Sequence, residues 1–205
     1  MIRIREERID TPEYYESVWS EETNQRPWYD ATRQRELLQH VRPGMDVLEV
    51  GAGVFGAIQY ALEQPYHGQE FGWLAVQDYS HTARDIVQAK FPQIEWVMDA
   101  IDDGLAFPDE SFDCVIAGEV IEHVEDPAAF VAELVRVCAP GGHITLSTVD
   151  TTCANARKLH PPLGHYPEHL WVFELGDLAG FFEKAGCSRF RAYLFGDYQM
   201  VEAMR

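Results

Sequence analysis

Three glycines that follow an apolar run have the clearest chemical potential in the chain: Gly51, Gly53 and Gly56, in the stretch 46–57. Glycine allows a tight turn and a close approach of the backbone to a ligand, and a helix that starts after the turn offers free N–H groups to a negative group. The order G-x-G-x-x-G is that of a dinucleotide fingerprint, and Asp78 follows Gly56 by 78 − 56 = 22 residues, where an acid that binds a ribose is expected. The stretch predicts a nucleotide-type site and leaves a nicotinamide cofactor open.

Acidic residues near the glycines bear on the choice of ligand. Glu49 precedes Gly51 by two residues, where a carboxylate would repel a diphosphate but attract a ligand ammonium. Asp99 follows the third expected strand, and the fourth is followed by the acidic segment Gly118–Pro127, which also holds His123. These features favour a ligand with a positive group over a dinucleotide.

Alternating strands and helices are expected to position these residues. Strands are predicted over 46–50, 71–77, 94–98, 112–117, 143–148, 188–195 and 198–204, the last two as an antiparallel hairpin. Helices are predicted over 12–19, 29–40, from about 58, 80–90, 126–138 and 174–185, with Thr11, Ser80 and Asp126 as caps and Pro140-Gly141-Gly142 ending the fifth helix before its strand. The fold class is therefore α/β, with a doubly wound, mostly parallel sheet.

Length and composition favour one domain over residues 1–205, with 1–44 as a helical cap and 45–205 as the α/β core. The sequence has no apolar window long enough for a membrane span and no signal peptide at its start, so we expect no membrane and a cytoplasmic location. The four scattered cysteines are expected to be reduced structural thiols. A formal net charge of −18 with no basic stripe argues against nucleic acid and favours a small molecule or a protein partner.

The chain resembles the class I S-adenosylmethionine-dependent methyltransferases, in particular the small-molecule group that includes the quinone-biosynthesis methyltransferases. The resemblance runs from about 41 to 183 and is carried by LEVGAG (48–53), Asp78, MDA (98–100), FPDESFDCVIAGEVIEHVEDP (107–127) and RVCAPGGHITLS (136–147). It implies a Rossmann-like, seven-stranded sheet whose last strand is antiparallel. One departure is that the family's third glycine, usually two residues after Gly53, is Phe55, and Gly56 follows one place later.

The resemblance also implies S-adenosylmethionine as the cofactor and assigns residues to its parts. Glu49, Gly51 and Gly53 would border the methionine part, Asp78 would bind the two ribose hydroxyls, and Asp99 with Ala100 would meet the adenine. The expected cofactor-binding set also includes Ala52, Tyr79 and Glu119.

Methyl transfer from a sulfonium is an in-line displacement with an activated leaving group, so positioning and the exclusion of water do much of the work. A hydroxyl acceptor of high pKa would need a base, for which His123, His165 and His169 are the candidates, and we expect residues 150–170 to close over the acceptor. Glu122 and His123 have two open interpretations: structural residues of a common loop motif, or ligands of a divalent ion together with Glu119, as in the similar quinone O-methyltransferases. Between these, we predict no metal.

The sequence thus predicts a methyltransferase for a small-molecule acceptor, with O-methylation ahead of N-methylation, in a monomer or homodimer. A nicotinamide oxidoreductase and a catalytically silent cofactor-binding subunit that activates a partner are the alternatives.

Overall fold

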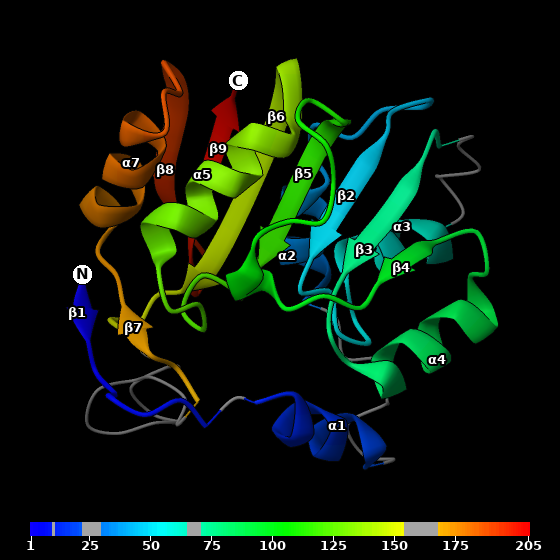
Figure 1. Cartoon of the computed structure of the whole chain (residues 1–205). Helices are drawn as coiled ribbons and strands as arrows, with labels where there is room; N and C mark the ends of the chain where they lie inside the picture. The colour runs from blue at the N-terminus through cyan, green and yellow to red at the C-terminus, as the bar shows by residue number, and fades with distance from the viewer. Residues whose placement is uncertain (10, 22–29, 65–70, 154–167) are drawn as a thin grey trace.

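The computed structural model describes residues 1–9, 11–21, 30–64, 71–153 and 168–205. A seven-stranded sheet lies at its centre, in the order β4-β3-β2-β5-β6-β9-β8 (Figure 1). Its strands are β2 (Val47–Val50), β3 (Leu74–Gln77), β4 (Glu95–Val97), β5 (Phe112–Gly118), β6 (Cys138–Val149), β8 (Arg189–Phe195) and β9 (Tyr198–Met204). β2 to β6 pair in parallel, whereas β9 is antiparallel to both β6 and β8. The predicted doubly wound, mostly parallel sheet with an antiparallel last strand is confirmed.

Helices cover both faces of this sheet. Strand residues alternate between the faces: Leu48 and Val50 pack in one core cluster with residues of α5 and α7, and Val47 packs in the other with residues of α2, α3 and α4. The helices are α2 (Ala31–Leu37), α3 (Ala57–Glu63), α4 (His81–Lys90), α5 (Pro127–Val137) and α7 (Leu175–Lys184). Both faces are therefore buried, as the near-continuous apolar run of β5 requires. Within the described residues, no helix has the length and apolar character to cross a membrane.

The helix caps follow the sequence. Thr11 accepts a hydrogen bond from the Tyr14 N–H at the start of α1 (Pro12–Ser20), and Ser80 and Asp126 do the same for α4 and α5. Figure 1 shows α1 beneath the carboxyl ends of the parallel strands. A short 3-10 turn, Ile101–Asp103, follows β4. The edge at which parallel α/β sheets bind ligands is thus the edge that α1 covers.

Two predictions about local structure are wrong. The segment Pro140-Gly141-Gly142 does not precede its strand but lies inside β6, because Cys138 already pairs with Phe112 and the extra residues form an irregularity before His143 pairs with Cys114. The backbone of Gly141 and Gly142 is held there by hydrogen bonds with Arg205 at the end of β9. The second helix is also shorter than expected, since Asp30 caps it and it ends at Leu37.

A two-stranded sheet that the sequence did not predict ties the start of the chain to a distant segment. β1 (Ile2–Arg3) pairs antiparallel with β7 (Trp171–Val172), and Arg3 lies over the Trp171 ring and forms an ion pair with Glu125. The 1–44 segment, expected to be helical only, therefore also contributes a strand. This pairing places α1 across the edge of the main sheet, where the candidate site lies.

Candidate functional site at the carboxyl edge of the sheet

A cavity of about 550 Å³ lies at this edge, enclosed by the ends of the strands and by α1 and α2. Its wall includes most of the residues that the sequence singled out: Gly51, Ala52, Gly53, Asp78, Tyr79, Glu119, His123 and His169. Glu49, Asp99 and Ala100 are not part of the wall, and Ile101, the residue after them in the chain, is. His165 lies outside the described residues, as does most of the expected lid over 150–170.

The glycine turn is shaped by its neighbours as well as by its own backbone. Gly51 has a φ of +66°, and a Cβ at this position would lie 2.4 Å from Cγ2 of Val120. Gly53 has a φ of +52°, and a Cβ there would lie 2.8 Å from Cζ2 of Trp19. A side chain at either position would meet both backbone strain and a steric clash. The turn therefore lies between the loop after β5 and helix α1, with its backbone exposed to the cavity.

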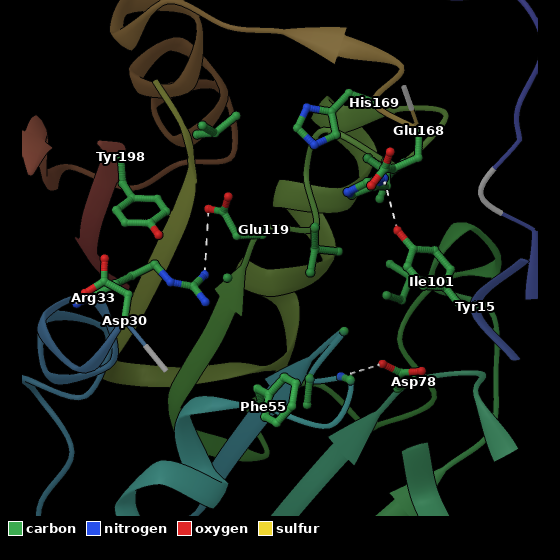
Figure 2. Close-up of a pocket in the computed structure, with 18 of the residues that line it drawn as sticks. Tyr15, Asp30, Arg33, Phe55, Asp78, Ile101, Glu119, Glu168, His169 and Tyr198 are labelled. Carbon is green, nitrogen blue, oxygen red and sulfur yellow. Dashed lines mark hydrogen bonds and ion pairs between the residues drawn. The ribbon is translucent and has the colours of Figure 1, made fainter. Parts of the chain in front are cut away.

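Asp78 connects the ends of β2 and β3. One carboxylate oxygen accepts a hydrogen bond from the Gly53 N–H at 2.9 Å (Figure 2). The other accepts one from the Ser80 N–H, also at 2.9 Å. Burial raises the pKa of this carboxyl, while the two N–H donors act in the opposite direction. Asp78 is thereby held at the cavity wall beside Tyr79, and its binding of a ribose stays a prediction.

Glu49 points toward the following helix. Strand alternation places it on the same sheet face as Val47, where its two carboxylate oxygens accept hydrogen bonds from the N–H groups of Ala57 and Ile58, at 2.5 and 2.9 Å. Gly56 is the N-cap of α3, and a Cβ there would lie 2.6 Å from the Glu49 carboxylate. The position of the third glycine is thus explained by the space that this capping carboxylate needs. Contact between Glu49 and a ligand ammonium stays a prediction.

Helix α1 closes the cavity with aromatic side chains. The Tyr15 hydroxyl lies 3.5 Å from Nδ1 of His123, and the Trp19 ring packs edge-on against Phe55 (Figure 2 shows Tyr15 and Phe55). Glu16 fixes the helix to α4, because its carboxylate accepts hydrogen bonds from the N–H groups of His81 and Thr82. α1 therefore contacts His123 through Tyr15 and the glycine turn through Trp19, while Glu16 holds it to α4.

Arg33 is a residue of the cavity wall that the sequence did not single out. It projects from α2 into the cavity, where its Nη1 lies 3.8 Å from a Glu119 carboxylate oxygen and its guanidinium lies over the Tyr198 ring, 5.2 Å from the centroid (Figure 2). Its Nε and Nη1 are buried and make no hydrogen bond within the described part of the chain. Helical spacing was the available signal, since Arg33 precedes the buried Leu37 by four residues and so shares its face.

Glu119 occupies an unusual backbone position at the end of β5. Its φ is +60°, and its side chain accepts a hydrogen bond from the Ser147 hydroxyl at 3.1 Å. A non-glycine residue in this left-handed region is strained, and such strain is concentrated at ligand sites. Burial raises the pKa of the Glu119 carboxyl, and the charge of Arg33 acts in the opposite direction. The Glu119 carboxyl group and the Arg33 guanidinium thus face the cavity side by side.

Beyond Glu119, the chain brings together one carboxyl group and two imidazoles. The His123 and His169 rings lie edge to face with centroids 4.9 Å apart, and Nε2 of His169 is 3.9 Å from a carboxylate oxygen of the buried Glu122. The metal alternative required Glu119, Glu122 and His123, but among the described residues the cluster with compatible donor atoms is Glu122, His123 and His169, within 4.8 Å of one another. Glu119 instead faces Ser147 and Arg33.

A family model described as a methyltransferase domain matches residues 21–189. The chain belongs to this methyltransferase family. It carries an S-adenosylmethionine-dependent methyltransferase domain, for which S-adenosylmethionine is the methyl donor. Membership excludes the nicotinamide oxidoreductase that the glycine spacing alone had left open.

Two similar proteins agree with this assignment, and one solved structure has the same fold. A probable S-adenosylmethionine-dependent methyltransferase of Mycobacterium tuberculosis is 32% identical over 168 residues, which are 77% of this chain and 57% of that protein. A 2-methyl-6-phytyl-1,4-hydroquinone methyltransferase of Synechocystis is 34% identical over 116 residues, 54% of this chain and 34% of that protein. The crystal structure of an S-adenosylmethionine-dependent methyltransferase from Aquifex aeolicus superposes with a TM-score of 0.67 at 19% identity, covering 95% of this chain and 98% of that one. The chain thus spans little more than half of its mycobacterial relative, and the Aquifex structure supports the fold alone.

Proposed function

We propose that this chain transfers the methyl group of S-adenosylmethionine to a hydroxyl group of a small molecule. The observation that carries the proposal is the placement of His123 in the cavity wall, with its Nδ1 at 3.5 Å from the Tyr15 hydroxyl and the His169 ring beside it. A hydroxyl of high pKa needs a base at the moment of transfer, whereas an amine attacks through its own lone pair. Two imidazoles at the cavity therefore favour O-methylation over N-methylation.

The cofactor would lie across the ends of β2 and β3. The backbone of Gly51, Ala52 and Gly53 would border its methionine part, with Glu49 acting behind the turn as the cap of α3. Asp78 and Tyr79 would bind the ribose, and the segment Asp99–Ile101 would meet the adenine through Ile101. This arrangement keeps the cofactor along the carboxyl edge, where the fold binds its ligands.

Arg33 and Glu119 would bind the amino-acid end of the cofactor. That end carries a carboxylate and an ammonium, and the cavity offers a carboxylate next to a guanidinium whose Nε and Nη1 make no hydrogen bond among the described residues. Charge-assisted hydrogen bonds of this kind are roughly twice as strong as neutral ones. The pair would set the direction in which the sulfonium points.

The acceptor would then occupy the part of the cavity next to His123, His169 and Tyr15. The displacement needs the acceptor oxygen in line with the methyl carbon and the sulfur, so orientation by these rings and exclusion of water by α1 would supply much of the rate. His123 would take the acceptor proton as the general base. The name of the Synechocystis relative gives a hydroquinone as its substrate without stating the acceptor atom, so hydroquinones are the first class of acceptor to test.

Turnover by the purified chain tests the proposal. The chain is incubated with methyl-labelled S-adenosylmethionine and separate panels of hydroquinones, catechols, alcohols and amines, and labelled product is measured with and without added S-adenosylhomocysteine as a product inhibitor. Preferential labelling of the hydroxyl panels supports O-methylation, and preferential labelling of the amines contradicts it. S-adenosylhomocysteine binding without turnover on any panel would instead favour the catalytically silent subunit.

We further propose that residues 1–205 act as one domain, in a monomer or homodimer, with no nucleic-acid partner. The net charge of −18 supports the last point, because it repels phosphate backbones. Size-exclusion chromatography with light scattering measures the oligomeric state.

A further inference from the structure

Tyr198 lies at the carboxyl edge of the parallel strands, although it belongs to the last strand of the chain. β9 runs antiparallel to β6, so its first residue, Tyr198, pairs with the last residue of β6, Val149. Both side chains belong to the cavity wall. The terminal hairpin thus brings an aromatic ring to the edge at which the cofactor would lie.

The Tyr198 ring contacts the guanidinium of Arg33. Cζ of Arg33 lies 5.2 Å from the ring centroid, which is within the range of a cation–π interaction (Figure 2 shows both side chains). Nη1 of Arg33 lies 3.8 Å from a Glu119 carboxylate oxygen, and a Cβ at Gly118 would lie 3.2 Å from the same Nη1. Because 3.8 Å is too long for a hydrogen bond, Glu119 alone does not fix the direction of the guanidinium. The ring supplies a second contact.

The same ring faces the start of the helix that carries Arg33. Asp30 caps α2, since its Oδ1 accepts hydrogen bonds from the N–H groups of Thr32 and Arg33 at 3.1 and 3.2 Å. Burial raises the pKa of the Tyr198 hydroxyl, and the positive charge of Arg33 acts in the opposite direction. The negative charges of Glu119 and Asp30 raise this pKa further. Tyr198 therefore acts on Arg33 as a neutral ring and not as a phenolate counter-ion.

We propose that Tyr198 is a positioning residue that orients Arg33 toward the carboxylate of the cofactor. The proposal rests on the role of Arg33 in the function proposed above. Nε and Nη1 of Arg33 are buried and make no hydrogen bond among the described residues, so neither donor is used within that part of the chain. A guanidinium binds a carboxylate through two parallel N–H bonds, which requires a defined orientation. A ring that holds Arg33 in place before the cofactor arrives reduces the entropy that is lost on binding.

Binding of two ligands that differ only in the carboxylate tests the proposal without any acceptor. S-adenosylhomocysteine and its decarboxylated analogue, which keeps the adenosine, the thioether and the ammonium, are each titrated into the full chain by isothermal titration calorimetry. Tyr198→Leu should weaken binding of S-adenosylhomocysteine about five- to thirtyfold, as expected for a cation–π contact away from bulk water, and leave the affinity for the analogue unchanged. Tyr198→Phe keeps the ring and should bind both ligands as the unmodified chain does. Equal losses for the two ligands, or no loss for S-adenosylhomocysteine, overturn the proposal.

Tyr193→Leu is the matched control on the same hairpin. Arg191 lies over the Tyr193 ring, 4.3 Å from the centroid, and the Tyr193 hydroxyl lies 2.6 Å from a carboxylate oxygen of Glu36 in α2. The variant therefore removes a tyrosine that contacts α2 but is not part of the cavity wall. Both affinities should be unchanged. A loss confined to S-adenosylhomocysteine would overturn the proposal, since a loosened α2 would then be sufficient to cause it.

Fluorinated phenylalanines at position 198 separate the cation–π contact from the shape of the ring. Fluorine withdraws electron density from the face of the ring and weakens its attraction for a cation. The affinity for S-adenosylhomocysteine should therefore fall stepwise from phenylalanine to its difluoro and pentafluoro derivatives, while the affinity for the decarboxylated analogue stays constant. A ring that only fills space would show no such dependence, and that result would overturn the proposal.

Arg33→Met separates this proposal from the proposed function. In this variant the loss should be confined to S-adenosylhomocysteine, and adding Tyr198→Leu should weaken its binding no further, because the two residues act through one contact. Equal losses for both ligands in Arg33→Met would refute the binding of the carboxylate by Arg33, and the role of Tyr198 with it. A selective loss in Arg33→Met together with an unselective one in Tyr198→Leu would refute the role of Tyr198 alone.

Discussion

Replacing Gly51 by alanine separates the two reasons for a glycine in the cofactor turn, and Gly44→Ala is its matched control. Both positions have positive φ angles, +66° at Gly51 and +82° at Gly44. An alanine in this left-handed region costs about 1–2 kcal/mol at either position. The positions differ in space: a Cβ at Gly44 has no atom within 4 Å, whereas a Cβ at Gly51 lies 2.4 Å from Cγ2 of Val120.

The steric clash with Val120 adds a second loss of unfolding free energy only at Gly51. Forcing extra volume into a packed site costs about 1–3 kcal/mol, so Gly51→Ala should lose about 2–5 kcal/mol of unfolding free energy and Gly44→Ala about 1–2 kcal/mol. The displaced Val120 belongs to the cavity wall, so the affinity for S-adenosylhomocysteine should fall about tenfold or more in Gly51→Ala, which is about 1.4 kcal/mol. In Gly44→Ala the affinity should not change.

Urea unfolding followed by tryptophan fluorescence gives the free energies, and isothermal titration calorimetry gives the affinities. The explanation would be refuted if Gly51→Ala lost no more stability than Gly44→Ala and still bound S-adenosylhomocysteine with unchanged affinity. The turn would then tolerate a side chain, and the contact with Val120 would not shape the site.

Three further variants test other parts of the site. Arg33→Met should weaken binding of S-adenosylmethionine and S-adenosylhomocysteine by about 10- to 100-fold each, because hydrogen bonds to charged groups contribute about 1.5–3 kcal/mol, while Arg35→Met on the exposed side of α2 should leave both affinities unchanged in calorimetry. Burial raises the pKa of the Glu122 carboxyl to about 8 in the folded chain, so the stabilisation from this group is complete below the unfolded pKa near 4.5 and is lost as the pH rises through 8. Urea unfolding should show that the stability of Glu122→Gln relative to the unmodified chain increases from pH 5 to pH 9, by at most about 1.4 kcal/mol per pH unit. Glu16→Gln should raise the dissociation rate of S-adenosylhomocysteine several-fold in stopped-flow measurements, since the carboxylate that holds α1 against α4 is lost, whereas Glu13→Gln on the exposed side of α1 should not.

The sequence was informative where local chemistry determines structure. Ser80 and Asp126 are caps because a side-chain oxygen next to free N–H groups is favourable in any fold, and β5 is apolar throughout because both faces of a parallel strand are buried. Predictions failed where partners come from distant parts of the chain. β1 and β7 have two residues each, too few for a periodic pattern, and only their mutual pairing makes them strands.

The same distinction between local and distant partners explains which residues of the site could be predicted. Gly51, Gly53 and Asp78 could be found because a turn and a strand end place them at the edge by local geometry. Arg33 could not be assigned a role, because its meaning depends on Glu119 and Tyr198, which lie 86 and 165 residues further along the chain (119 − 33 and 198 − 33). The side chain of Glu49 caps α3, a role that its sequence motif does not express, and its contact with a ligand stays a prediction.

The contact between Glu49 and Gly56 has a consequence for how such chains diverge. The carboxylate occupies the space that a side chain at position 56 would need, so position 56 cannot gain a side chain while Glu49 is retained. A Cβ at position 56 would also lie 2.9 Å from the Cβ of Ala52. Homologues with a shorter side chain at position 49 and glycine at position 52 should therefore accept alanine or serine at position 56, and those that keep the glutamate should keep glycine there. In an alignment, the glycine that covaries with Glu49 would therefore be the one at the N-cap of the helix, whatever its distance in residues from the first glycine of the turn.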